Sequence, residues 1–221
     1  MAPPSYRLYT TPGSLFAFAP LVVAEYVGVS VAIEPLEDDE DTIGGVLASK
    51  SPTGKAPVLE TKRGETIASS LAIARFLARL RLDSDLSGRT GSLRDAVAVE
   101  DWTNWATQEL ELPACTSCYM ATKILPLDVM GFAKAKTDLA RALRVLETHL
   151  RDAPTTYLVL PDEVSLADIV VACYLVYPFT LVLEEADLVN FPTVTRWFRN
   201  CTQQPEFIAV LGKIECGKRK C

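Results

Sequence analysis

The 221-residue sequence lacks several features that would place it in a specialised class of protein. No uninterrupted apolar run approaches the ~18 residues that span a bilayer, and Met1-Ala2-Pro3-Pro4 has neither the basic nor the apolar region of a signal peptide. Lysine and arginine (22) are outnumbered by aspartate and glutamate (28), and a net charge of −6 is not typical of a nucleic-acid-binding domain. We therefore expect a cytoplasmic protein that binds neither a membrane nor nucleic acid directly.

Metal-ligand patterns are also scarce. His149 is the only histidine, and Cys115-Thr-Ser-Cys118 has no second CxxC to complete a zinc site, so no metal is expected. A dithiol oxidoreductase carries its CxxC after the first strand, where this chain has Thr11-Pro12-Gly13-Ser14. In a long chain without a secretory signal, the six cysteines are expected to be free thiols. We interpret Cys115 and Cys118 as helix-packing thiols, with a redox pair as the alternative, and Cys173 as part of the core.

What the sequence does contain is ordinary globular composition, with 49% hydrophobic and 23% charged residues. The pattern of its first third predicts alternating strands and helices. The predicted segments are a strand over 5–9, a helix over 14–27, a strand over 29–33, a hairpin of 58–59 with 66–67, and a helix over 70–82. This order is that of an α/β thioredoxin-like domain with a mixed sheet.

Beyond a polar segment the signals are helical throughout. Leu139, Leu143, Leu146 and Leu150 recur at helical spacing. Ser165 and Asp168 form a capping box before an apolar run that should lie at a domain centre. We therefore predict a thioredoxin-like thiol-binding domain over 1–82, a linker over 83–92, an all-α C-terminal domain over 93–212, and the start of a basic linker over 213–221.

One segment offers two groups that can hold a peptide-like ligand. Pro57 cannot donate to a sheet and so belongs at a first strand position or an edge. We predict that the Ala56–Pro57 bond is cis, which would leave the backbone N–H and C=O of Ala56 to pair with an extended ligand. Ser69 and Ser70 then begin a helix whose N–H groups and dipole face an anion.

These segments carry a family resemblance. Gly54–Glu60, Ser70–Ile73 and Val164–Ile169 resemble motifs of the glutathione transferase superfamily, which implies its fold. The run Phe191–Phe198, with Gln204–Phe207 after it, resembles the glutathione-transferase-like domain of the elongation factor 1 gamma subfamily.

The resemblance implies a thiol site. Ala56 would pair its backbone with the cysteinyl unit of glutathione or a related thiol, Pro57 would hold that geometry, Ser70 would bind the γ-glutamyl carboxylate, and Lys55 would approach the negative end of the ligand. The superfamily often carries Glu or Gln where this chain has Ser69. The neutral Ser69 hydroxyl replaces the charge-assisted hydrogen bond that such a residue makes with the ligand, which can lose about 1–3 kcal/mol of binding free energy.

The catalytic hydroxyl that would favour the thiolate has three candidates, Ser14, Thr11 and Tyr9, all near the end of the first strand. Ser14 is best placed, because a helix N-terminus favours a nearby thiolate. For each of the three residues the alternative to catalysis is a structural role, as a helix cap, a hydrogen-bonding hydroxyl in a turn, or a packed aromatic ring.

Two functions follow from the resemblance. The first is a scaffold that holds the nucleotide-exchange subunit of elongation factor 1. The second is a transferase that conjugates glutathione, or a polyamine-linked thiol such as trypanothione, to electrophiles. A homodimer and an aminoacyl-tRNA synthetase are further partners to consider.

Overall fold

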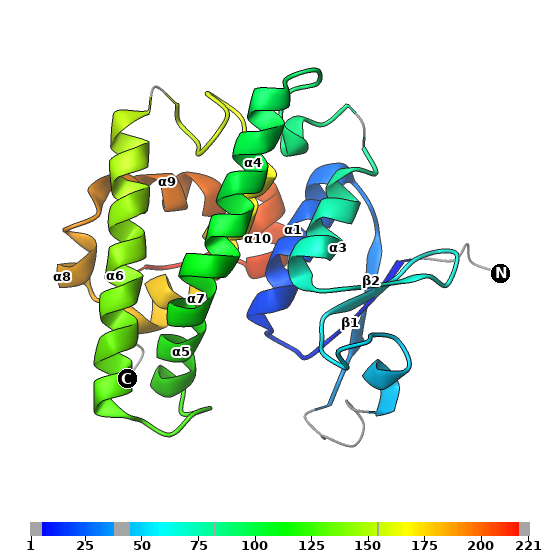
Figure 1. Ribbon diagram of the computed structural model, residues 1–221, viewed down its shortest axis with the longest axis horizontal. Helices are drawn as coiled ribbons and strands as arrows, with labels where there is room; N and C mark the ends of the chain where they lie inside the picture. Colours follow the sequence, from blue (N-terminus) through cyan, green and yellow to red (C-terminus); the bar gives the residue numbers. More distant parts are fainter. Residues whose placement is uncertain (1–5, 38–44, 82, 154, 217–221) are drawn as a thin grey trace. The chain divides into compact units, whose positions relative to one another are not determined.

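The protein forms two compact units, Met1–Ser84 and Asp85–Cys221. The computed structural model describes residues 6–37, 45–81, 83–153 and 155–216 (Figure 1). The first unit is α/β and the second is helical, so the predicted thioredoxin-like domain followed by an all-α domain is confirmed. The opening residues 1–4 and the basic residues 218–220 lie outside the described residues.

The first unit is built on a four-stranded mixed sheet in the order β2-β1-β3-β4. Its strands are β1 (Tyr6–Thr10), β2 (Val31–Pro35), β3 (Val58–Glu60) and β4 (Thr66–Ala68). β1 pairs parallel with β2 and antiparallel with β3, and β3 pairs antiparallel with β4. The parallel pair requires a crossover, which α1 (Leu15–Val27) supplies.

Two helices lie side by side in this unit, α1 and α3 (Ser70–Ala78) (Figure 1). The cross-strand partners Leu8 and Leu59 are fully buried, as are Ile73 and Leu77 of α3. Full burial of a leucine or isoleucine contributes about 1.5–3 kcal/mol, so these residues anchor the core of the unit.

The second strand begins later than predicted. β2 starts at Val31 rather than at residue 29, because Gly28 and Val29 close the C-terminal end of α1. Gly28 adopts a left-handed φ of 68°, and the Val29 N–H donates to the Ala24 carbonyl at 2.9 Å, which closes the helix. α3 is also shorter than predicted, since it ends at Ala78.

Over residues 85–153 and 155–216, the second unit contains α-helices, one 3₁₀ turn and two π-helical segments. They are η1 (Asp85–Ser87), α4 (Leu93–Trp105), η2 (Ala106–Leu110), α5 (Glu111–Ala121), α6 (Val129–Asp152), α7 (Leu166–Tyr177), η3 (Pro178–Val182), α8 (Glu185–Leu188), α9 (Pro192–Thr202) and α10 (Pro205–Leu211). Among the described residues, none of these helices has the length and apolar character needed to cross a membrane.

The core of this unit follows the predicted pattern. The four leucines of α6 singled out by their spacing are all buried, and α7 is buried along nearly its whole length. The capping box at Ser165 is present, with the Ser165 N–H donating to Asp168 Oδ2 at 2.9 Å. Asp168 is fully buried and also accepts from Leu158 N–H at 2.8 Å and Trp197 Nε1 at 2.9 Å. The carboxylate therefore ties α7 to α9 as well as capping its own helix.

Candidate functional site

The sheet of the first unit brings the predicted ligand-binding segments to one end. Tyr9 pairs with Val58, and Val58 pairs with Ala68, so the C-termini of β1 and β4 lie beside the N-terminus of β3. The residues that follow β1, precede β3 and follow β4 therefore meet at this end. These residues are Thr11, Ser14, Lys55, Ala56, Pro57, Ser69 and Ser70.

The Ala56–Pro57 bond is cis, as predicted. Pro57 is buried just before β3, while Ala56 is half-buried and packs against a small core of Leu36, Leu47 and Val58. Lys55 is exposed beside it.

Ser69 and Ser70 begin α3 as predicted, with different roles. Ser69 is the N-cap, and its hydroxyl accepts from the Ala72 N–H at 3.4 Å. Its φ of 76° with ψ of 132° is a conformation that costs a non-glycine residue about 1–3 kcal/mol. Such strain is concentrated at ligand clamps and active sites. Ser70 is half-buried in the first turn, where helix N–H groups have no intrahelical partner.

Ser14 occupies the N-cap of α1. Its N–H donates to the Thr11 carbonyl at 3.1 Å, which closes a turn after β1. Its hydroxyl forms no capping hydrogen bond. The hydroxyl therefore lies beside the N–H groups in the first turn of α1 but accepts no capping hydrogen bond from them.

Tyr9 lies in a different environment. Its phenol donates to Glu60 Oε2 at 3.1 Å, and the Lys50 ammonium lies 4.6 Å from its ring centre. Glu60 also binds Lys50 and Arg7. Its hydrogen bond from Lys50 lowers the pKa of the Glu60 carboxyl, so this carboxylate stays ionised. A phenol that donates to this carboxylate is poorly placed to donate to a thiolate.

The cysteines of α5 are deeply packed. Cys115 and Cys118 are free and buried, and burial raises the pKa of each thiol to about 12. Since the thiolate is the reactive form, these thiols are inert at neutral pH. Cys173 is buried in α7, as predicted. Among the described residues, no three His, Cys, Asp or Glu side chains group as a metal site.

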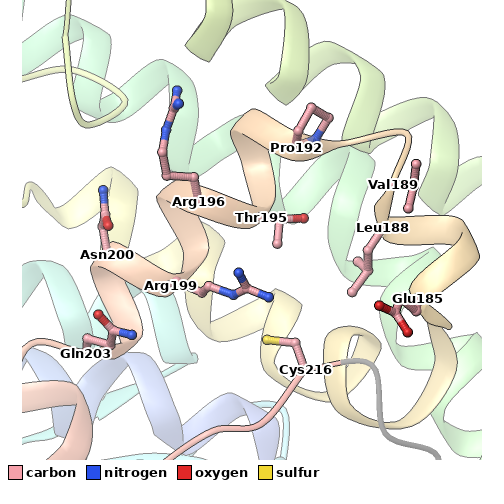
Figure 2. Close-up of a pocket in the computed structure, with 10 residues that line it drawn as sticks. All are labelled: Glu185, Leu188, Val189, Pro192, Thr195, Arg196, Arg199, Asn200, Gln203 and Cys216. Carbon is pink, nitrogen blue, oxygen red and sulfur yellow. The ribbon is translucent and has the colours of Figure 1, made fainter.

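The structure also contains a groove that the sequence did not reveal. It has a volume of about 660 Å³ and lies in the second unit, between α8, α9 and the segment after α10 (Figure 2). Arg199 and Cys216 both point into it, with the guanidinium beside the thiol. Only the outward face of α9, with Arg196, Arg199 and Asn200 at helical spacing, hints at it in the sequence.

Comparison with known families defines the class of this protein. The family "Glutathione S-transferase, N-terminal domain" matches residues 4–79, and "Glutathione S-transferase, C-terminal domain" matches residues 110–205. The chain therefore belongs to the glutathione S-transferase family, which confirms the superfamily resemblance.

Within that family the chain is related to elongation factor 1-gamma, as its C-terminal run predicted. It is 36% identical over 209 residues to "Elongation factor 1-gamma 3" of Oryza sativa subsp. japonica, covering 94% of this chain and 49% of the relative. It is 32% identical over 212 residues to "Elongation factor 1-gamma" of Carassius auratus, covering 94% and 46%. The chain thus spans about half the length of the curated relatives it matches.

Solved structures support the fold. The GST-like domain of elongation factor 1-gamma from Saccharomyces cerevisiae superposes with a TM-score of 0.79 at 18% identity, covering 98% of this chain and 97% of that one. Ure2p in complex with glutathione superposes with a TM-score of 0.83 at 16% identity, covering 96% and 100%. At these identities the likeness establishes the glutathione transferase fold.

Proposed function

We propose that this chain acts as an assembly platform of translation elongation in the cytoplasm, holding the nucleotide-exchange subunit of elongation factor 1. The observation that carries the proposal is the relationship to elongation factor 1-gamma, which extends over 94% of the chain. A folded unit of this size offers more than the ~800 Å² per partner of a standard interface.

An exposed apolar patch in the second unit suggests where the partner binds. Figure 1 shows the turn that joins α5 to α6. This turn and the first residues of α6 carry five large apolar side chains that are 41–78% exposed: Ile124, Leu125, Leu127, Val129 and Met130. Apolar side chains gathered on a surface mark interaction sites more often than isolated ones do. We call these five residues the turn patch and assign the exchange subunit to it.

The test is isothermal titration of the chain with the N-terminal region of an exchange subunit. We expect binding at micromolar concentration or tighter, weakened at least tenfold by the double change Leu127→Asp and Met130→Asp. Val189→Asp, at an equally exposed apolar residue outside the patch, is the matched control. No heat or mobility change with folded protein at tens of micromolar would refute the scaffold role. Full binding by the double variant would refute only the patch. Titration of an aminoacyl-tRNA synthetase and sedimentation of the chain alone test the other two partners.

A second candidate function is thiol binding by the first unit, with weak or selective transferase activity. The specific observation in its favour is that the sheet register gathers Lys55, Ala56, Pro57, Ser69 and Ser70 at one end, with Ser69 in a strained conformation. We assign the cysteinyl backbone to Ala56, the γ-glutamyl carboxylate to Ser70, and thiolate stabilisation to Ser14, with Thr11 next to it. The engagement of Tyr9 with Glu60 makes it the weakest of the three hydroxyl candidates.

Titration with reduced glutathione and trypanothione tests this site. Ser70→Ala should weaken thiol binding more than Ser14→Ala does, while Ser14→Ala should lower turnover at saturating thiol. Ser49→Ala, a change of an exposed hydroxyl elsewhere in the unit, is the control. If neither thiol binds at millimolar concentration, the thiol-binding proposal is wrong. The scaffold proposal would survive that result, because it depends on the second unit.

A further inference from the structure

Cys216 has surroundings unlike those of the other described cysteines. It is half-exposed at the edge of the groove, and the Arg199 guanidinium lies beside its thiol (Figure 2). The remaining described cysteines are buried: Cys115, Cys118, Cys173 and Cys201. Reactive cysteines lie in partly exposed, electropositive surroundings, because a nearby cation favours the thiolate. Among the described cysteines, Cys216 meets both conditions.

A buried hydroxyl in the same groove has no hydrogen-bond partner among the described residues. Helical threonines of this protein commonly donate to the carbonyl four residues earlier, as Thr122, Thr137, Thr180 and Thr202 do at 2.8–2.9 Å. Thr195 lines the groove and is 9% exposed, yet its hydroxyl finds no hydrogen-bond partner among the described residues. A buried polar atom without a hydrogen-bond partner costs about 1–3 kcal/mol of folding stability. A ligand group that hydrogen-bonds to Thr195 would recover this free energy.

The two walls of the groove carry opposite charges. Arg199 extends from α9, and Glu185 extends from α8 on the other side (Figure 2). Within the part of the chain that the structure describes, neither forms an ion pair. Leu188 and Pro192 add apolar surface to the groove. At about 660 Å³ the groove is within the range of small-molecule sites.

These features together describe a ligand that carries a carboxylate, an ammonium group and sulfur. We propose that Cys216 is a site of S-thiolation by small amino-acid-derived thiols, which arrive as their disulfides. The carboxylate of the incoming half pairs with Arg199, its ammonium group faces Glu185, and the Thr195 hydroxyl supplies a further hydrogen bond.

The reaction is a thiol–disulfide exchange that needs no other oxidant. The Cys216 thiol loses its proton, and the thiolate attacks one sulfur of the disulfide. A bond forms between Cys216 Sγ and that sulfur, the original S–S bond breaks, and the leaving thiolate takes up a proton. Cys216 is thereby oxidised, and one half of the small disulfide is reduced to a free thiol.

The electrostatics of the groove set the pH dependence. Burial raises the pKa of the Cys216 thiol, while the charge and hydrogen bond of Arg199 oppose that rise. Two other charged groups line the groove among the described residues: Glu185 of α8, whose negative charge disfavours the thiolate, and Arg196 of α9, whose positive charge favours it. We therefore expect the modification to accelerate from neutral to alkaline pH.

The experiment uses the full chain with Cys221→Ser, because residue 221 lies outside the described residues. The protein is treated with glutathione disulfide, which carries both charges, and separately with neutral 2-hydroxyethyl disulfide. Peptide mass spectrometry then follows each cysteine over time. We expect Cys216 to be the first cysteine modified by either reagent. Arg199→Gln should lower the rate of Cys216 modification by glutathione disulfide about tenfold, but the rate with the neutral disulfide only about twofold. Thr195→Val should slow glutathione disulfide alone.

Arg144→Gln is the matched control, because Arg144 is also exposed but lies on α6 outside the groove. Thermal unfolding of each variant confirms that it is folded. If Arg199→Gln lowers the rates of modification by both disulfides equally, the proposal is overturned. Arg199 would then act on the Cys216 thiol without recognising the half of the disulfide that becomes attached. Modification that spreads evenly over the buried cysteines would also overturn it.

Discussion

We expect Asp168→Asn to destabilise the helical unit more than any other single isosteric change of a carboxylate in it. The Asp168 carboxylate accepts hydrogen bonds from Leu158 N–H, Ser165 N–H, the Ser165 hydroxyl and Trp197 Nε1, at 2.7–2.9 Å. Burial raises the pKa of this carboxyl, and the four hydrogen bonds act against the rise. The donors converge on a side chain that water does not reach.

The magnitude follows from the number of donors. Asparagine keeps one acceptor oxygen and presents an NH₂ group in place of the other, so about half of the four donors lose their partner. Each buried donor left unpaired costs about 1–3 kcal/mol, which gives a loss of about 2–6 kcal/mol. Since a domain is stable by only about 5–15 kcal/mol, the loss should lower the melting temperature on the order of 10 °C.

Tryptophan fluorescence during urea unfolding is the assay. All three tryptophans, Trp102, Trp105 and Trp197, belong to the second unit, so the signal reports on that unit. Asp162→Asn, at an exposed aspartate before the same helix, is the matched control and should change little. A loss below about 1 kcal/mol for Asp168→Asn would show that its donors find other partners, and the reasoning would fail.

Three further predictions concern local electrostatics and strain. Glu147→Gln should cost about 1 kcal/mol by the same fluorescence assay, because both carboxylate oxygens accept N–H groups at the start of α9. Ser69→Gly should leave the first unit about 1 kcal/mol more stable than Ser69→Ala in hydrogen-exchange mass spectrometry, since both remove the cap but only glycine tolerates a φ of 76°. The pKa of Glu60 is lowered by Lys50, so its stabilisation is present above the ordinary value of 4.5 and lost as the pH falls through the lower folded value. Glu60→Gln should therefore remove part of the acid sensitivity of hydrogen exchange in β1 and β3, and an unchanged pH profile would count against this assignment.

The Asp168 network shows what the sequence could and could not predict. Ser165 and Asp168 are three residues apart, so their pairing follows from the capping-box pattern. Leu158 and Trp197 lie 10 and 29 residues from Asp168. The bond from Leu158 depends on the path of the segment before α7, and the bond from Trp197 depends on how α7 and α9 pack. A local pattern identified the helix start, but only the tertiary structure shows why the carboxylate is buried.

Tyr9 illustrates the same limit at the candidate site. Tyr9 was a candidate for thiolate stabilisation because, like Ser14 and Thr11, it lies near the end of the first strand. The phenol instead donates to Glu60, 51 residues away. Cross-strand pairing of Arg7 with Glu60 sets that contact, and the pairing register was not known from the sequence. The order of strands and helices along the chain, unlike the register, was predicted from the sequence.

The two proposed functions can be separated because they depend on different compact units. The turn patch belongs to the second unit, and the thiol-binding residues belong to the first. A charged substitution in the patch should therefore leave thiol binding unchanged, and Ser70→Ala should leave exchange-subunit binding unchanged. A single-site variant that loses both activities while each unit keeps its unfolding transition would show that the two units are coupled. Loss of both with a weakened transition would show only that the variant is unfolded.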